Sequence, residues 1–249
     1  MKLIGNTIFI TGGTTGIGRS LAEALHKRGN QVIISGRRKG HLAEVTKANP
    51  GMQSLELNVE DPASIAAVAK KLIAEYPKLN VLINNAGIMQ MDDAAGAIDE
   101  AVLVSIVTTN LLGPIRMTSA LIEHLKKQPS ATVINVSSGL AFVPLASTAV
   151  YSATKAAIHS YTQSMRYRLK GSSVRVLELI PPWVQTDLLN SKDEPRAMPL
   201  AAFIEEAVTV LGTDAEEVMV ERVKMLRNNP GPNEFVFVAQ FNAMIASAH

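Results

Sequence analysis

The sequence has no cysteine, which excludes disulfide bonds, thiolate metal sites and cysteine nucleophiles. It also has little charge: 24 Lys and Arg residues stand against 22 Asp and Glu residues, and charged residues make up 18% of the chain. This balance gives no positive field for binding nucleic acid, so we expect no such partner. No run approaches the ~18 apolar residues of a membrane span, and the start lacks a signal-peptide cleavage site. We therefore expect a cytoplasmic protein without a membrane partner.

Hydrophobic residues make up 47% of the 249 residues, which suits a globular protein with a full core. Short, almost continuously apolar runs alternate with longer segments of helical period, as expected for strands buried on both faces and joined by helices. The pattern predicts an α/β fold: a single Rossmann-like domain over residues 1–249, with a doubly wound parallel sheet of about seven strands and helices on both faces. The runs that predict strands are 7–11, 31–35, 81–83, 132–137 and 174–180, with a weaker one at 53–58.

Two sites carry helix-start signals. Asp61 followed by Pro62 is typical of a helix N-terminus, because Asp accepts a free N–H and Pro fits the first helical position. Thr213 with Glu216 fits a capping box, and this pair predicts a late helix that runs to about residue 227.

Two segments interrupt the alternation. Residues 188–200 are rich in polar residues and proline and predict a loop, which we expect to cover a site and contact substrate. After the Pro230-Gly231-Pro232 turn, residues 234–238 read Glu-Phe-Val-Phe-Val and predict a last short strand.

A glycine-rich turn follows the first predicted strand. Glycines there would let the backbone approach a ligand, and the helix that follows would present free N–H groups to a pyrophosphate. The alternative is a glycine-rich turn that binds nothing, but the position after the first strand of a βαβ unit favours a dinucleotide. The candidate binding residues of this turn are Gly12, Thr14, Gly16, Ile17 and Gly18.

Tyr151 and Lys155 are four residues apart in a helical segment, so both side chains can reach one site. A neighbouring ammonium favours the phenolate form of a tyrosine, which makes the pair suitable for moving a proton to or from an alcohol oxygen. Taken alone, the pair is better explained as an ordinary surface pair on a helix.

Four motifs occur in order: Thr11-Gly-x-x-x-Gly-x-Gly18, Asn84-Asn85-Ala86-Gly87, Ser138, and Tyr151-x-x-x-Lys155. Over roughly residues 5 to 190 they resemble the short-chain dehydrogenase/reductase family, in its shorter single-domain branch. The resemblance implies reversible hydride transfer between a nicotinamide cofactor and a small-molecule carbonyl or alcohol substrate. It also implies a homodimer or homotetramer.

The resemblance implies a catalytic tetrad of Asn110, Ser138, Tyr151 and Lys155. Ser138 would hold the substrate oxygen, with Ser137 as the neighbouring alternative, and Tyr151 would act as acid/base. Asn110 would link Lys155 to a water-borne proton path. Tyr151 and Lys155 would also contact the cofactor.

The end of the second predicted strand bears on the choice of cofactor. An NAD site has an acidic residue there, whereas this chain has Gly36 followed by Arg37 and Arg38. A guanidinium can bind a 2′-phosphate through two hydrogen bonds, so we favour NADP(H) over NAD(H). The alternative is an ordinary solvated basic loop.

Further cofactor contacts are implied by the resemblance at seven positions: Asn58, Val59, Asn85, Ala86, Gly87, Val184 and Thr186. The chain departs from the family at Pro182, which replaces a glycine in the segment that binds the carboxamide. Proline fixes φ and lacks an N–H, so this turn is stiffer. The Pro-Pro pair resembles a subgroup that includes oxidoreductases named for D-alanylation operons.

Two other functions are considered as alternatives. A catalytically silent nucleotide-sensing module would keep the fold, although such modules usually lose the tyrosine or lysine. A sugar-nucleotide epimerase needs an added C-terminal domain, and roughly 60 residues after Thr186 are too few for one. We expect no metal site, because none of five histidines has a metal-ligand spacing with carboxylates: His26, His41, His124, His159 and His249.

Overall fold

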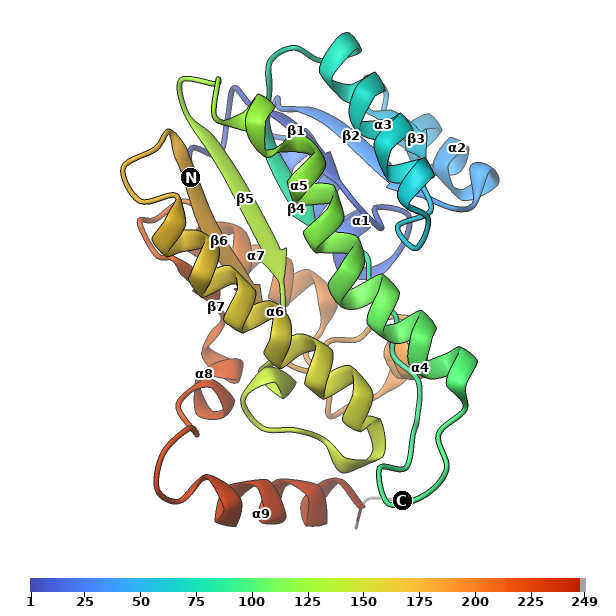
Figure 1. Ribbon diagram of the computed structural model, residues 1–249, viewed down its shortest axis with the longest axis vertical. Helices are drawn as coiled ribbons and strands as arrows, with labels where there is room; N and C mark the ends of the chain where they lie inside the picture. Colours follow the sequence, from blue (N-terminus) through green and yellow to red (C-terminus); the bar gives the residue numbers. More distant parts are fainter. Residues whose placement is uncertain (247–249) are drawn as a thin grey trace.

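The computed structural model describes residues 1–246 and contains one parallel sheet (Figure 1). Its strand order is β3-β2-β1-β4-β5-β6-β7. The strands are β1 (Thr7–Ile10), β2 (Gln31–Gly36), β3 (Gln53–Glu56), β4 (Leu79–Asn84), β5 (Ala131–Val136), β6 (Val174–Ile180) and β7 (Glu217–Met219). The expected single-domain, doubly wound α/β architecture is confirmed.

Helices cover both faces of this sheet. In Figure 1, α3, α5 and α6 lie in front of it, with α1 and α7 behind. Because alternate strand residues face opposite ways, Phe9 packs with the first layer, whereas Ile8 and Ile10 pack with the second. The helices are α1 (Gly16–His26), α2 (Lys39–Ala48), α3 (Pro62–Glu75), α4 (Glu100–Val107), α5 (Gly113–Leu125), α6 (Ala149–Arg168), α7 (Leu200–Leu211), α8 (Glu221–Arg227) and α9 (Glu234–Ala246).

The expected start of α3 is confirmed. Pro62 is its first residue, and Asp61 Oδ1 accepts a hydrogen bond of 2.9 Å from the Ala63 backbone N–H. This contact satisfies one of the N–H groups that a helix N-terminus leaves free.

The predicted helix from Thr213 to residue 227 is wrong in its first half. Residues Glu217–Met219 form β7, in register with Glu178–Ile180 of β6, and only Glu221–Arg227 is helical. Thr213 closes the preceding helix, since its Oγ1 donates to the Val210 carbonyl oxygen at 2.7 Å. Pairing with the edge of β6 outweighed the local capping signal, because tertiary contacts override local helix preferences.

The predicted strand at 234–238 is also wrong, because these residues begin α9. The edge that a last strand would need beside β6 is occupied by β7. None of the α9 residues is buried: Phe235 is 79% exposed and Val236 58% exposed. Asn242 connects the helix to the loop after β5, since its side chain accepts from the Ala146 N–H and donates to the Pro144 carbonyl oxygen.

The expectation that no segment approaches the length and apolarity of a membrane span is corrected by the helical stretch Glu100–Leu125. It joins α4, a π-helical turn at Thr108–Leu112 and α5, and it is long and apolar enough to cross a membrane by length and composition. Of its most apolar window, 39% is buried against the rest of the protein. Its α5 part packs on β4 and β5 of the sheet, and its π-turn carries Asn110.

Candidate active site

Many of the sequence-predicted site residues lie at the carboxyl ends of four adjacent strands, in the order β1-β4-β5-β6, whereas Arg37, Arg38, Asn58 and Val59 follow β2 and β3. Chain connectivity reverses direction between β1 and β4, which is where open α/β sheets bind their ligands. Each of these four strands is followed directly by one of the motifs: the glycine-rich turn, 85–87, Ser138, and 182–186.

The glycine-rich turn after β1 is packed closely on the segment after β4. Gly12 has a φ of +68°, and a Cβ there would lie 2.8 Å from the Ala86 Cα. A Cβ on Gly18 would lie 2.2 Å from the Gly12 carbonyl oxygen. The Asn85 side chain donates to the carbonyl oxygens of Thr11 and Gly12, each at 3.0 Å. Glycine is therefore required by close packing as well as by backbone conformation.

Helix α1 starts at Gly16, inside this turn. Thr15 precedes it and makes no capping hydrogen bond with its side chain, so the first-turn N–H groups have no side-chain partner there. A helix start of this kind binds anionic groups such as phosphate. Thr186 lies against the same turn, because a Cβ on Gly16 would be 3.4 Å from its Cγ2. The arrangement fits a dinucleotide that reaches from the turn to the segment around Thr186.

Tyr151 and Lys155 lie on the first turns of α6, and Ser138 follows β5. All three side chains are buried, with relative exposures of 7%, 4% and 8%. The Lys155 Nζ lies 5.4 Å from the centroid of the Tyr151 ring and donates to the Val136 carbonyl oxygen at 2.9 Å. The structure thus brings together three of the four expected catalytic side chains.

Burial shifts the proton affinities of this group. It raises the pKa of Tyr151 to about 12, with a side-chain hydrogen bond to Ser138 acting in the opposite direction. Burial lowers the pKa of Lys155 to about 8, opposed by the negative charge of Glu178. At neutral pH, Tyr151 is therefore a phenol that can donate a proton, beside a mostly protonated lysine.

Asn110 lies at the π-turn between α4 and α5 and is 1% exposed. Its side chain bonds both backbone groups of Ile88, accepting from the N–H at 2.9 Å and donating to the carbonyl oxygen at 2.8 Å. It also donates to Thr154 of α6 at 3.3 Å. A Cβ on Gly87 would lie 3.4 Å from Asn110 Oδ1 and 3.6 Å from Lys155 Nζ, so this glycine lies beside both side chains.

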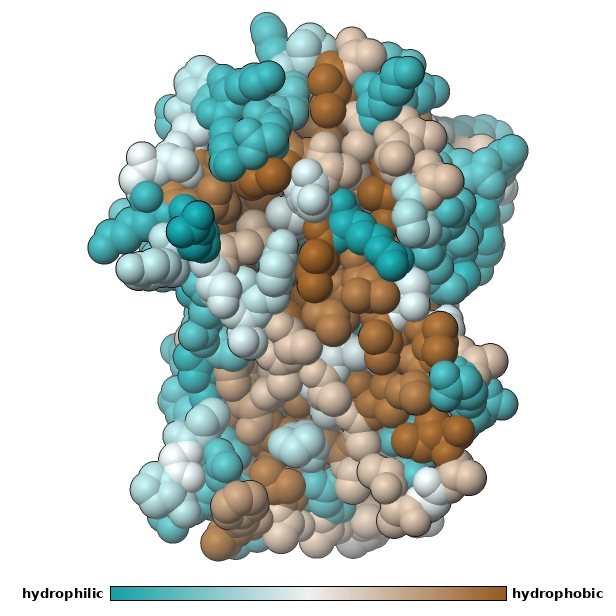
Figure 2. Space-filling model, viewed as in Figure 1, coloured by the Kyte–Doolittle hydropathy of each residue, from teal (hydrophilic) through white to brown (hydrophobic). Residues whose placement is uncertain are grey.

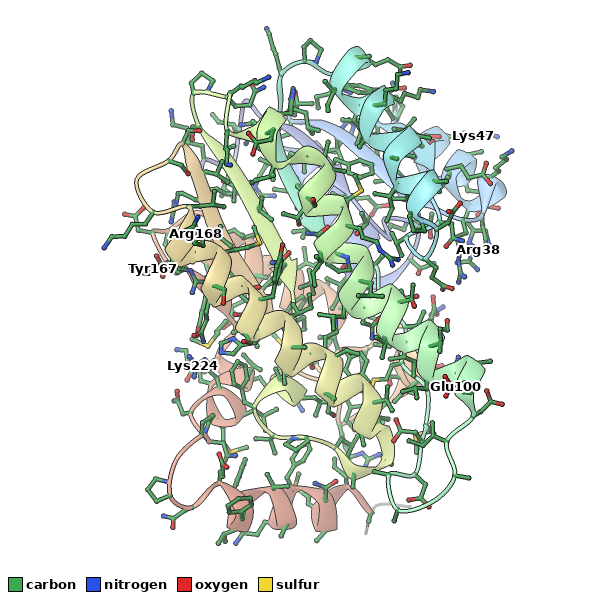
Figure 3. The ribbon with its side chains drawn as sticks, viewed as in Figure 1. Arg38, Lys47, Glu100, Tyr167, Arg168 and Lys224 are labelled. Carbon is green, nitrogen blue, oxygen red and sulfur yellow. The ribbon has the colours of Figure 1, made fainter. Side chains whose placement is uncertain are left out.

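Arg37 and Arg38 follow β2 at the other end of the site, and both are exposed; Figure 3 labels Arg38 at the start of α2. Arg37 Nη1 lies 3.5 Å from Glu60 Oε1, and the side chain lines a hollow of about 350 Å³ that also includes Asn58. Gly36 packs closely on Thr14, because a Cβ there would lie 3.1 Å from its Cγ2.

Three other predicted contact residues, Asn58, Val59 and Val184, are held by different neighbours. Asn58 Oδ1 accepts a hydrogen bond from the Glu60 N–H at 3.2 Å, and Val59 packs against Gly113. Val184 is 5% exposed and forms a parallel β-bridge with Met198, which ties the 182–186 segment to the end of the 188–200 loop.

The entry to α6 is held by a residue that sequence analysis missed. Asp92, in the segment between β4 and α4, accepts hydrogen bonds from the backbone N–H groups of Ala149 at 2.8 Å and Val150 at 2.9 Å. Tyr151 is the next residue. No local pattern marks this contact, because the two segments are 57 residues apart in sequence.

His159 has no metal-ligand spacing with carboxylates in the sequence, but in the folded chain it lies beside two of them. One ligand atom each from His159, Glu178 and Glu217 lies within 4.8 Å of the others. The signal that could have indicated this group is Glu178 itself, a charged residue inside the apolar run of a buried strand.

Both the sequence and the fold of this chain are similar to those of known proteins. Residues 6–197 match the family described as short chain dehydrogenase. The chain is 38% identical over 234 residues to the uncharacterized oxidoreductase DltE of Bacillus subtilis, covering 92% of this chain and 93% of that protein. A solved short chain dehydrogenase of Burkholderia cenocepacia in complex with NADP has a TM-score of 0.85 at 27% identity, over 96% and 98% of the two chains. The 3-ketoacyl-(acyl-carrier-protein) reductase of Brucella melitensis complexed with NADH has a TM-score of 0.78 at 26% identity, over 86% and 93%.

Proposed function

The chain belongs to the short chain dehydrogenase family, and from that premise we propose that it is an NADP(H)-dependent oxidoreductase acting on a carbonyl or alcohol substrate, with Tyr151 as the acid/base. The observation that carries this proposal is the burial of Tyr151 beside Ser138 and Lys155, at the strand ends next to the glycine-rich turn. A phenol, a hydroxyl and an ammonium in one desolvated group suit proton transfer to or from a substrate oxygen.

The cofactor would be held by the glycine-rich turn, by 85–87 and by the segment from Val184 to Thr186. When bound, its nicotinamide gives hydride to the carbonyl carbon or takes it from the alcohol carbon. In reduction, Ser138 holds the carbonyl oxygen by a hydrogen bond, and the Tyr151 hydroxyl donates its proton to that oxygen. The product is the alcohol, and Tyr151 is left as a phenolate.

Lys155 stabilises that phenolate through its positive charge. Asn110 fixes the backbone at Ile88 and contacts α6 through Thr154, and we assign to it the link between Lys155 and a water-borne proton path. The tyrosine regains its proton by this route. The reverse sequence of proton steps oxidises an alcohol.

The preference for NADP(H) rests on Arg37, because a guanidinium in the hollow beside Asn58 can bind a 2′-phosphate. Gly36 supplies no carboxylate that would select the 2′-hydroxyl of NAD. Glu60 competes for the same guanidinium at 3.5 Å, so the phosphate would have to displace this exposed ion pair. An exposed pair contributes little and can be displaced by a better partner.

Substrate selection would fall to the 188–200 loop, whose first half, Leu188–Asp193, consists of two short 3₁₀ turns joined by a kink at Leu189 and Asn190, which have positive φ. Trp183 connects it to the segment after β6, since its indole N–H donates to Ser191 at 2.7 Å. Arg196 lies 5.0 Å over the same ring. The support for a substrate role is this direct link to the segment that would hold the nicotinamide.

We also propose a homodimer or homotetramer. Much of the Glu100–Leu125 stretch is apolar without being buried, and Val104 in α4 is 51% exposed. Figure 2 shows apolar residues gathered over α4 and the adjoining part of α5. A contiguous apolar surface of this kind is typical of an interface between subunits.

The test compares Tyr151→Phe with Tyr167→Phe, a control on the exposed side of the same helix that Figure 3 labels. We expect NADPH to quench Trp183 fluorescence in both variants, and carbonyl reduction to be lost only in Tyr151→Phe. Full turnover in Tyr151→Phe would refute the acid/base role. A wild-type protein that binds NADPH but reduces no carbonyl compound would be a nucleotide-sensing module instead.

A further inference from the structure

A row of polar side chains crosses the sheet beneath α6, one from each of four neighbouring strands. Strand register pairs Asn84 with Asn135, Asn135 with Glu178, and Glu178 with Glu217. The first two are hydrogen-bonded to each other at 2.9 Å, and Asn135 donates to Thr162 of α6 at 2.9 Å. The row therefore faces the helix that carries Tyr151 and Lys155.

Glu178 is the fully buried carboxylate of this row, and it lies between apolar neighbours in β6. Burying a carboxylate costs free energy unless it is paired and hydrogen-bonded. Its Oε2 bonds His159 Nδ1 at 2.8 Å, whereas its Oε1 has no hydrogen-bond partner among the residues that the structure describes. Among the described residues, therefore, no hydrogen bond to Oε1 compensates for its burial.

Two cations interact electrostatically with Glu178: Arg227, which is already bonded to Glu217, and Lys155. Tyr151, Lys155 and His159 are spaced four apart on α6, so they share one face of the helix. The Lys155 ammonium donates to the Val136 carbonyl oxygen, and Val136 is adjacent on β5 to Asn135, the register partner of Glu178. A carbonyl oxygen satisfies one donor of a buried ammonium but leaves its charge unbalanced.

Glu217, the other carboxylate of the group, is already neutralised. Arg227 of α8 bonds both its oxygens, at 2.8 and 2.9 Å. This ion pair also argues against a metal ion held by His159, Glu178 and Glu217, because a cation would have to displace the guanidinium. Glu178 remains the carboxylate whose charge is available to the active site.

We propose that Glu178 is a positioning residue for the reaction assigned above: its buried carboxylate is the counter-charge that keeps Lys155 an ammonium, and His159 fixes the orientation of that carboxylate. The inference rests on the proposed function for its catalytic meaning. Its electrostatic part concerns only residues of this chain and can be tested without turnover.

The charges around Lys155 agree with this assignment. Burial lowers the pKa of Lys155, and Glu178 is the group that opposes the decrease. The ionisable groups near the pair come from three elements: Tyr151 and His159 from α6, Glu217 from β7 and Arg227 from α8. Removing the Glu178 charge leaves Lys155 with the effect of burial alone, which favours its neutral form.

The first experiment measures the Lys155 titration by NMR of protein carrying ¹³C-labelled lysine, without cofactor, with the Lys155 signal identified by its loss in Lys155→Arg. We expect Glu178→Gln to shift this titration to lower pH by about one unit, since a nearby opposite charge has an effect of that order. Glu216→Gln is the matched control, because Glu216 is exposed and precedes the register partner of Glu178. An unshifted Lys155 titration in Glu178→Gln would overturn the proposal.

Glu178→Asp covers the case in which Glu178→Gln does not fold. It keeps the charge but withdraws it by one methylene, so a smaller shift in the same direction is expected, and an unchanged titration counts against the proposal.

A second experiment follows turnover. In the pH profile of kcat/KM, the decrease at alkaline pH should begin at a lower pH in Glu178→Gln than in the wild type. A uniformly reduced profile whose alkaline decrease begins at the wild-type pH would mean a merely structural role. If the wild type lacks turnover, the proposed function fails while the NMR titration still decides the Glu178–Lys155 coupling.

Discussion

The Lys155 Nζ lies 5.4 Å from the centroid of the Tyr151 ring, and both residues are almost completely buried on consecutive turns of α6. Burial acts on them in opposite directions, because it disfavours the anion of one and the cation of the other. Desolvation thus stabilises the neutral form of each side chain relative to its charged form. The site therefore favours a protonated tyrosine, and its lysine loses its charge at a lower pH than an exposed lysine would.

The first prediction follows from these two pKa values. Carbonyl reduction requires a protonated Tyr151, present up to about pH 12, and a cationic Lys155, present up to about pH 8. As pH rises through 8, Lys155 loses its proton while Tyr151 keeps its own, so kcat/KM for reduction should fall about tenfold per pH unit above that point. The pH profile of NADPH oxidation with a carbonyl substrate measures this. A constant rate well above pH 8 would contradict the assigned role of Lys155.

The second prediction concerns Arg37. Replacing it in Arg37→Asp removes the guanidinium and adds a carboxylate one residue after the position where NAD sites have one, so the preference should shift from NADPH to NADH. We expect KM for NADPH to rise at least about tenfold, which corresponds to roughly 1.4 kcal/mol. Lys47→Asp is a control of equal charge change, since Lys47 is exposed at the far end of α2 (Figure 3). If both variants keep the wild-type ratio of NADPH to NADH, the cofactor assignment is wrong.

The third prediction concerns Gly18 in the glycine-rich turn. In Gly18→Ala the new Cβ would lie 2.2 Å from the Gly12 carbonyl oxygen, so the turn must move away from Asn85. We expect a loss of stability of about 1–3 kcal/mol and weaker binding of cofactor. Gly40→Ala is the control, because a Cβ on this helical glycine meets nothing within 4 Å and alanine favours helix. Denaturant unfolding and fluorescence titration measure the two effects, and equal behaviour of the two variants would disprove the packing argument.

The fourth prediction concerns Asp92, which caps the helix that carries the catalytic tyrosine. Asp92→Ala removes hydrogen bonds to the Ala149 and Val150 N–H groups and should cost about 0.5–2 kcal/mol of stability. Because Tyr151 follows directly, kcat should fall more than KM rises. Asp93→Ala is the control, since the Asp93 side chain accepts from the nearby Ala95 N–H, within its own loop. Unchanged kcat in Asp92→Ala would show that the cap does not orient Tyr151.

Much of the central fold was predictable because its signals are local. The run at 174–180 became β6 with the same bounds, since a strand buried on both faces is rich in apolar residues. The Asp61-Pro62 signal likewise acts within one helical turn. The two wrong elements lie where local signals fit either of two structures. Glu217–Met219 became a strand because β6 offered a free edge, and residues 234–238 became helical because that edge was then occupied.

The sequence by itself determined the strand and helix alternation and the motif positions, and hence which side chains follow which strands. Only the tertiary structure decided that Glu178 lies across the sheet from Asn135, that Asp92 caps α6, and that Arg227 neutralises Glu217. These relationships join residues from separate elements, and they depend on strand register and helix packing. The alternation of strands and helices can be read from the sequence because its pattern repeats along the chain. Contacts between distant segments arise only when the chain has folded.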